Sequence, residues 1–304
     1  MNKYLHPLLG LLLSFTIGGA FADTPASPAT QASSAGIAFS LIKTGHTHAQ
    51  AGMVYSGGSF FQKLEINHVA VLVQHLRGSF LFDSGLGKDI AAQYQQDMPW
   101  WAKPSFYYEP PVNPARTQLD QAGIAVPRII LSHSHWDHAS GLVDFPEAEV
   151  WITAEERNWD RQHPGFPGAF PSQVGSPSIQ WHTYALEDKP CFGFPRSLDL
   201  FGDGSAVLLP LPGHTPGAVG LLLTLASGKQ YLFCGDTVWS AQALKDASPK
   251  SFLASLIADN DREGTQRAID LLHKLMLQHP GLVVMPAHDA ALQDTLGYFP
   301  QWVR

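Results

Sequence analysis

Apolar residues in this chain occur mostly in short runs bounded by glycine, proline and polar residues, a pattern typical of buried strands. The pattern predicts strands at residues 37–43, 60–66, 69–73, 79–82, 124–131, 149–153, 206–209, 220–225, 229–233 and 282–285. Helical spacing is rarer and falls between these runs. Strands and helices therefore alternate without a linker in the middle, which indicates an α/β domain.

The clearest helix covers residues 261–278, where Ile269, Leu272 and Leu275 share one face and His279-Pro280-Gly281 ends it. Shorter helices are predicted at 89–96, from Pro114 to a terminal Gly123, from 139 onwards, and at 154–160. Residues 98–111 are aromatic and interrupted by proline, and residues 163–175 have no period. We expect both to be loops, the first of them covering a site.

The beginning of the chain resembles a targeting sequence rather than part of the folded domain. A positive start at Met1-Asn2-Lys3 is followed by apolar residues 8–17 and by Ala20-Phe21-Ala22. This predicts a signal peptide at 1–22, hence a periplasmic or secreted protein. The apolar run is too short for a membrane anchor, which needs ~20 residues, so no membrane span is expected after cleavage. Residues 23–36, rich in Ala, Ser, Thr and Pro, predict a disordered linker ahead of a domain at 37–304.

The composition of the chain limits its possible partners and disulfides. The chain has 304 residues, 45% hydrophobic and 15% charged, with a net charge of −7. A nucleic-acid partner would need a basic surface, so none is expected. Only Cys191 and Cys234 are present. Cys234 follows an apolar run and is predicted to be a buried free thiol, with a disulfide to Cys191 as the alternative.

The chemistry gathers directly after the apolar residues 128–131. His133 and His135, two residues apart on a strand, can point the same way, and Asp137 and His138 follow where the chain turns. Neutral imidazoles and carboxylates suit zinc, manganese or iron. A histidine-rich surface loop is the alternative explanation for this cluster alone.

Three further strand ends carry residues of the same type. His214 lies in the turn Gly213-His214-Thr215-Pro216-Gly217, Asp236 in Gly235-Asp236-Thr237, and His288 in Ala287-His288-Asp289. One such residue would usually be merely exposed. Four strand ends offering ligand-type residues in order favour a metal centre.

These motifs, with Phe82-Asp83-Ser84-Gly85, resemble the ligand set of the metallo-β-lactamase superfamily from about Val69 to His288. The resemblance implies an αββα sandwich, two mixed β-sheets face to face with helices outside. It also implies two divalent metal ions, Zn²⁺ first among the candidates and Fe, Mn or Co as alternatives. His133, His135 and His214 would hold the first ion. Asp137, His138 and His288 would hold the second, Asp236 would bridge both, and Asp137 and Asp236 are the candidate catalytic carboxylates.

The resemblance says less about the substrate than about the fold and the metal ligands. True β-lactamases place Cys or Ser where this chain has Asp236, and acyl-homoserine lactonases usually carry a tyrosine where it has Trp239. Tyr107 or Tyr108 could supply a phenol instead. No Lys/Arg cluster suggests an anion clamp, which argues against glyoxalase II-type thioesterases. Trp136, Trp239 and Phe166 favour a small apolar or acylated substrate.

The leading hypothesis is therefore a metal-dependent lactonase or esterase of the quorum-quenching type. The alternatives are a phosphotriesterase, a β-lactamase, and a metal-binding module without catalysis. The aromatic segment 98–111 could serve a homodimer contact as well as a substrate.

Overall fold

The computed structural model describes residues 36–304. The predicted signal peptide and residues 23–35 of the predicted linker lie outside the described residues. The division of the chain at residues 22 and 36 therefore stays a prediction. None of the helices within residues 36–304 is long and apolar enough to cross a membrane.

One sheet has six strands in the order of the chain, β1 to β6. The first three strands are antiparallel and the rest run parallel to β3. The strands are β1 (Ala38–Gln50), β2 (Lys63–His75), β3 (Gly78–Phe82), β4 (Arg128–Ile130), β5 (Glu149–Thr153) and β6 (Gln180–Tyr184). Its parallel half brings the end of β4 to the same edge as the end of β3, which is where the metal-type residues begin.

The other sheet has five strands in the order β11-β10-β9-β8-β7. They are β7 (Leu198–Asp199), β8 (Ala206–Pro210), β9 (Val219–Thr224), β10 (Gln230–Phe233) and β11 (Leu282–Met285). Only the β10–β11 pair is parallel, because helix α9 connects these two strands. Both sheets are therefore mixed.

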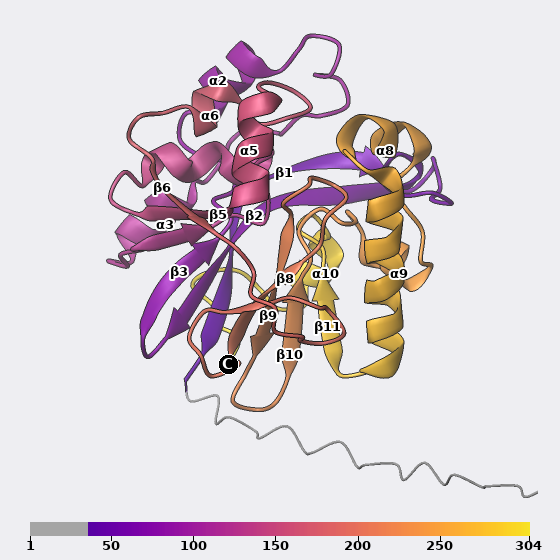
Figure 1. The fold of residues 1–304 in the computed structure, drawn as a ribbon. Helices are drawn as coiled ribbons and strands as arrows, with labels where there is room; N and C mark the ends of the chain where they lie inside the picture. Colours follow the sequence, from indigo (N-terminus) through magenta and orange to yellow (C-terminus); the bar gives the residue numbers. More distant parts are fainter. Residues whose placement is uncertain (1–35) are drawn as a thin grey trace, which may run out of the picture. The chain divides into compact units, whose positions relative to one another are not determined.

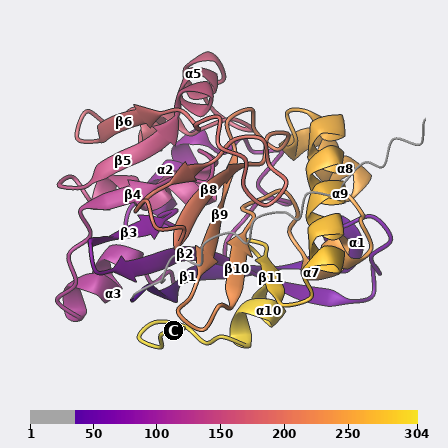
Figure 2. The same ribbon diagram turned by 60° about the horizontal axis from the view of Figure 1, so that its bottom comes forward.

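The two sheets face each other over a core of apolar residues. Phe39 and Phe82 from the first sheet and Leu221 and Tyr231 from the second belong to this core, and the rings of Phe39 and Tyr231 lie 4.8 Å apart. Each sheet buries its other face under helices, and Figure 2 shows α9 (Arg262–Gln278) beside β10 and β11. The layers are helix, sheet, sheet, helix, which confirms the predicted αββα sandwich (Figure 1).

The remaining helices are short. They are α1 (Ala51–Val54), α2 (Ile90–Asp97), α3 (Ala115–Gln121), α4 (Trp136–Ala139), the 3₁₀ helix η1 (Ser140–Asp144), α5 (Ala154–Gln162), α6 (Pro171–Val174), α7 (Ala241–Lys245), α8 (Phe252–Ala258) and α10 (Ala290–Asp294). Residues 98–111 form an irregular segment, as predicted.

Several boundaries correct the sequence-based expectations. The strands predicted at 60–66 and 69–73 are one continuous strand, β2, because Asn67 and His68 pair in register with His46 and Gly45 of β1. The strand predicted at 124–131 is only three residues long, and the helix expected from 139 begins earlier, at Trp136. Cys191 and Cys234 are free and Cys234 is buried, as predicted, so the disulfide alternative is wrong.

Candidate metal centre

All seven predicted ligands lie in segments that directly follow strands, at the edge where the two sheets meet. His133 and His135 follow β4, with Asp137 and His138 on α4. The other three follow β8, β10 and β11, and are His214, Asp236 and His288. All seven side chains are buried. Residues more than 150 positions apart in number thus meet because each sheet delivers its strand ends to this edge.

Two tight turns hold these segments. Asp83 adopts a left-handed φ of 62° after β3, and its carboxylate accepts hydrogen bonds from the Ser132 backbone N–H (2.7 Å) and hydroxyl (2.8 Å). Gly213 has φ +142°, and an added Cβ would lie 2.3 Å from the backbone nitrogen of Thr265. A side chain is therefore excluded at Gly213, where the loop carrying His214 packs against the first turn of α9.

The first group consists of His133, His135 and His214, whose donor atoms all lie within 4.8 Å of one another. His135 Nδ1 lies 2.8 Å from His214 Nε2. Burial and the neighbouring His214 imidazole lower the pKa of His135 to about 3. Burial also lowers the pKa of His133, and the nearby His138 and His135 add to this. Neutral imidazoles are the form that binds a metal ion.

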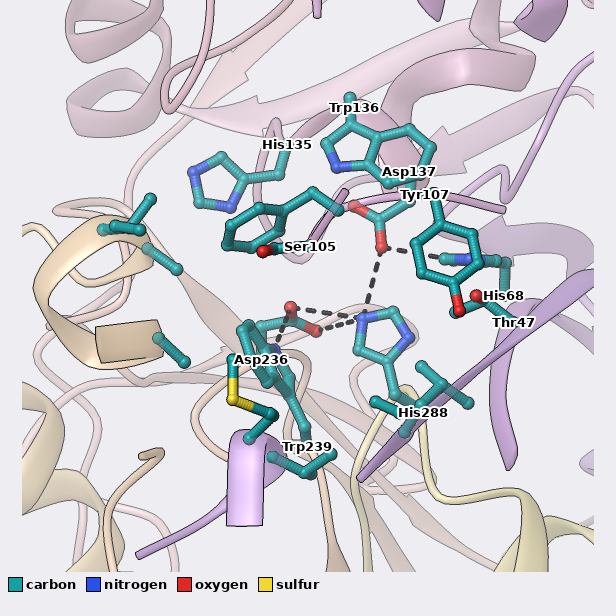
Figure 3. Close-up of a pocket in the computed structure, with 18 of the residues that line it drawn as sticks. Thr47, His68, Ser105, Tyr107, His135, Trp136, Asp137, Asp236, Trp239 and His288 are labelled. Atoms are coloured by element: carbon teal, nitrogen blue, oxygen red, sulfur yellow. Dashed lines mark hydrogen bonds and ion pairs between the residues drawn. The ribbon is translucent and has the colours of Figure 1, made fainter. Parts of the chain in front are cut away.

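The second group surrounds the Asp137 carboxylate. Oδ2 of Asp137 lies 3.3 Å from His288 Nε2 and 4.0 Å from His138 Nε2. A further residue, His68 of β2, places its Nδ1 3.2 Å from the same oxygen (Figure 3). His68 is buried and joins Asp137 and His288 as a third group able to hold an ion.

Asp236 faces both groups. Its Oδ2 lies 3.6 Å from His214 Nε2, whereas its Oδ1 lies 3.1 Å from His138 Nε2 and 3.0 Å from His288 Nε2. Oδ2 also lies 3.2 Å from His288 Nε2, so both oxygens contact the second group and Oδ2 reaches the first as well, a placement that a bridging ligand would need. Trp239 donates a hydrogen bond of 2.7 Å from Nε1 to Oδ2 and fixes the carboxylate plane.

A second set of polar groups orients the imidazoles. Asp83 accepts from His138 Nδ1 at 2.8 Å, Asp259 accepts from His214 Nδ1 at 2.9 Å, and the Asn67 carbonyl accepts from His288 Nδ1 at 2.7 Å. Carboxylates and carbonyls can only accept, so these Nδ1 atoms carry the protons. The Nε2 lone pairs then face the centre, as in metal-binding histidines.

The residues fit a metal site by their unpaired polar atoms. His133 Nε2 is buried without a hydrogen-bond partner, and His138 Nε2 and Asp236 Oδ1 lie 3.1 Å apart without the geometry of a hydrogen bond, which is costly unless a ligand completes these atoms. Burial opposes ionisation of Asp236, but His288 and His138 outweigh it and hold the pKa well below its usual range. The carboxylates in turn outweigh burial and raise the pKa of His138. A divalent cation would displace these protons and take over the charge compensation.

The centre opens into a cavity of about 370 Å³. Trp136, Trp239, Tyr107 and Phe166 line it, together with the apolar side chains Met53, Val54, Phe106, Leu253 and Ile257. The Tyr107 hydroxyl donates to the His48 carbonyl at 2.9 Å. Tyr108 is not among the lining residues; it packs against Tyr94, with ring centroids 5.5 Å apart. The phenol expected near the reacting atoms is thus not supplied by Tyr108.

Sequence reasoning missed three contributors to the centre. His68 stands directly before the apolar residues of β2, and no local motif marks it. Asp259 and Lys250, whose side chains are fully buried and 2.7 Å apart, come from the ends of α8 and reach His214 only through the fold. A buried lysine and aspartate in a polar-looking segment give no signal in a single sequence.

Comparison with known proteins agrees with this geometry. A family model described as the metallo-beta-lactamase superfamily matches residues 65–286. A probable metallo-hydrolase of Mycobacterium tuberculosis is 29% identical over 192 residues, 59% of this chain and 60% of that protein. The chain thus matches less than two thirds of that relative's length.

Two lactonases are similar over a longer stretch. An N-acyl homoserine lactonase of Agrobacterium fabrum, AttM, is 23% identical over 226 residues, 72% of this chain and 80% of the relative. The structure of AiiA from B. thuringiensis, with N-decanoyl-L-homoserine bound at its active site, superposes with a TM-score of 0.70 at 17% identity. It covers 88% of this chain and 98% of AiiA, and shows a shared fold.

Proposed function

Because the chain belongs to the metallo-beta-lactamase superfamily and is a hydrolase of that family, we propose that it hydrolyses the cyclic or open ester of a small acylated substrate, with a lactone as the preferred class. The observation that carries the proposal is the joining of the centre to an apolar cavity. Asp236 and Asp137 stand in the same wall as Trp136, Trp239 and Phe166.

His133, His135 and His214, whose donor atoms converge, would hold one divalent ion. Asp137, His138 and His288 would hold the other, as the family resemblance implies, with Asp236 between the two sets. Two bound divalent cations would supply Lewis acidity at the scissile carbonyl and lower the pKa of an attacking water. Zn²⁺ is the ion we propose, since imidazole-rich sets suit it best.

Side chains of the cavity wall would orient the reacting groups and exclude bulk water. Asp137 Oδ2 lies at the cavity wall between His68 and His288, where it can accept the proton of the attacking water and return it to the leaving alkoxide. Trp136 and Phe166 exclude water from the acyl side of the cavity. His68 faces Asp137 with its Nδ1 at 3.2 Å, and both of its ring nitrogens are buried without a hydrogen-bond partner.

The scarcity of basic side chains in the cavity wall argues for a neutral substrate. Among the described residues that line the cavity, Lys63 is the only lysine or arginine. A phosphate or a glutathione carboxylate would need an arginine or lysine clamp. An acyl chain needs only apolar surface, and the burial of each of its methylene groups contributes about 0.8 kcal/mol to the free energy of binding.

The test is a substrate panel on the metal-loaded protein: N-acyl homoserine lactones of increasing chain length, a phenyl ester, a glutathione thioester, a paraoxon-type phosphotriester and nitrocefin. We expect kcat/KM to be highest for lactones and to rise with chain length. Turnover of the thioester, phosphotriester or nitrocefin without any lactone turnover would refute the lactonase assignment.

We further propose that the protein is exported, on the strength of residues 1–22. Expression of the full chain in a Gram-negative host, followed by fractionation and mass spectrometry, should give a mature N-terminus at Asp23 outside the cytoplasm. A protein that keeps Met1 and stays in the cytoplasm would contradict this.

A further inference from the structure

We propose that His46, His48 and Glu109 form an additional divalent-metal site at the rim of the cavity, separate from the buried centre. The site would take a borderline cation of the Zn²⁺, Ni²⁺ or Cu²⁺ class, for which two imidazoles and a carboxylate are suitable ligands. His48 also lines the cavity, so the rim site adjoins the substrate space.

The donor atoms already converge. His46 and His48 are two residues apart on β1, so both side chains leave the same face of the strand. His48 Nδ1 lies 2.9 Å from Glu109 Oε1, and His46 Nε2 lies 3.5 Å from Glu109 Oε2. Ligands of a tetrahedral zinc ion at 2.0–2.1 Å are separated by about 3.3 Å, so the ion requires only small side-chain adjustments.

The backbone that carries these ligands is fixed. The Glu109 N–H donates to the His46 carbonyl at 2.8 Å, and the Tyr107 hydroxyl donates to the His48 carbonyl at 2.9 Å. Further along, the Asn113 N–H donates to the Thr44 carbonyl at 2.7 Å. Because segment 107–113 is pinned along β1, little conformational entropy is lost when an ion binds.

The exposure of the site distinguishes it from the central one. The side chains of His46, His48 and Glu109 are 33%, 27% and 37% exposed. Water can therefore complete the coordination, and an ion can exchange with solvent. Glu65, opposite His48 in the β1–β2 register, is already paired with Lys43 at 2.6 Å, so Glu109 is the carboxylate available to the ion.

Without an ion, the three groups form only a hydrogen-bonded cluster. An ion bound by all three would tie β1 to the segment that carries Tyr107. The rim site would then stiffen one wall of the cavity without taking part in the hydrolytic chemistry.

The experiment uses the full chain, reconstituted with Zn²⁺, desalted, and then titrated with Zn²⁺ by calorimetry. We expect the wild type to show one additional binding event per chain. The event should be absent in the double variant His46→Ala/His48→Ala and at least tenfold weaker in Glu109→Gln, which keeps the shape of the side chain. The control variant His182→Ala/His279→Ala removes two exposed imidazoles elsewhere and should behave like the wild type.

A spectroscopic arm identifies the ligands. Cu²⁺ added to the desalted wild type should give an electron paramagnetic resonance signal with nitrogen hyperfine structure that the double variant lacks. The proposal is overturned if the wild type shows no additional Zn²⁺ event, or if all four proteins give the same isotherm. Hydrolysis plays no part in these readouts, so failure of the lactonase assignment would leave this test unaffected.

Discussion

Replacing Lys250 by methionine would leave the Asp259 carboxylate as a buried charge without its cation. Lys250 Nζ lies 2.7 Å from Asp259 Oδ1, and both side chains are fully buried. Lys250 also donates to the Thr237 carbonyl at 3.2 Å, in the turn after Asp236. Asp259 in turn accepts from His214 Nδ1, so the ion pair stands directly behind a proposed metal ligand.

The structure sets the size of the effect. Removing one partner of a buried ion pair costs about 3–5 kcal/mol, because the remaining charge stays desolvated. Asp259 retains hydrogen bonds from Ser255 Oγ at 2.7 Å and from His214, which places the expected loss for Lys250→Met at the lower end, about 3 kcal/mol. Adding Asp259→Asn removes the unpaired charge and keeps an oxygen acceptor for His214. The double variant should therefore be more stable than Lys250→Met, with a coupling of about 2 kcal/mol.

The assay is equilibrium unfolding in urea at neutral pH, in the presence of a chelator, for the wild type, the two single variants and the double variant. A chelator separates the stability of the fold from the contribution of metal binding. The reasoning is refuted if the two single costs simply add, or if Lys250→Met lies within about 0.5 kcal/mol of the wild type.

Three other predictions concern the centre and Glu156, whose carboxylate accepts from the Ser134 N–H and hydroxyl between His133 and His135. Asp236→Ala should abolish hydrolysis and lower the metal content measured by mass spectrometry, because both groups lose a shared oxygen; an unchanged metal content would exclude the bridging role. Trp239→Phe removes the N–H that holds Asp236 Oδ2 at 2.7 Å and should weaken Zn²⁺ binding about 10–100-fold while the cavity stays apolar, as a chelator competition would measure. Burial and the neighbouring Asp160 raise the pKa of Glu156 to about 7 from its ordinary 4.5. The folded state then holds a proton that the unfolded state releases between these values, so the contribution of Glu156 to the stability of the metal-free protein should fall by about 3 kcal/mol as the pH rises from 4.5 to 7. The difference in stability between Glu156→Gln and the wild type, from urea melts at stepped pH, should change by that amount over this range, and a pH-independent difference would contradict the prediction.

The candidate metal ligands stand out in the sequence because each sits in a short motif that follows a strand. Apolar residues ahead of His133, His214, Asp236 and His288 mark the strands. Glycine or proline near the last three of these ligands marks the turns. Local patterns of this kind survive without knowledge of the tertiary structure. The αββα order followed from the same runs together with the family resemblance.

Other features depend on contacts that a local pattern does not contain. His68 is polar because it faces Asp137 in the centre, and Asn67 because its side chain donates to Gln293 and Tyr298, so the two residues divide β2 into two apparent strands in the sequence. The strand β4 is short because the chain turns after Leu131, whose N–H still donates to the Trp151 carbonyl, and the next N–H, of Ser132, donates to the Asp83 carboxylate instead. Lys250 and Asp259 look like surface residues until the fold buries them against His214.

The centre draws its ligands from both sheets: His133 and His135 follow a strand of one, and His214 and His288 follow strands of the other. An ion held between them would cross-link the two halves of the sandwich, and it could do so only after the sheets had packed. Interactions that form after the folding transition state slow unfolding and leave the folding rate nearly unchanged. Metal retention would thus set the lifetime of the native molecule. Under the export proposed above, that lifetime would determine how long the protein persists among proteases outside the cytoplasm.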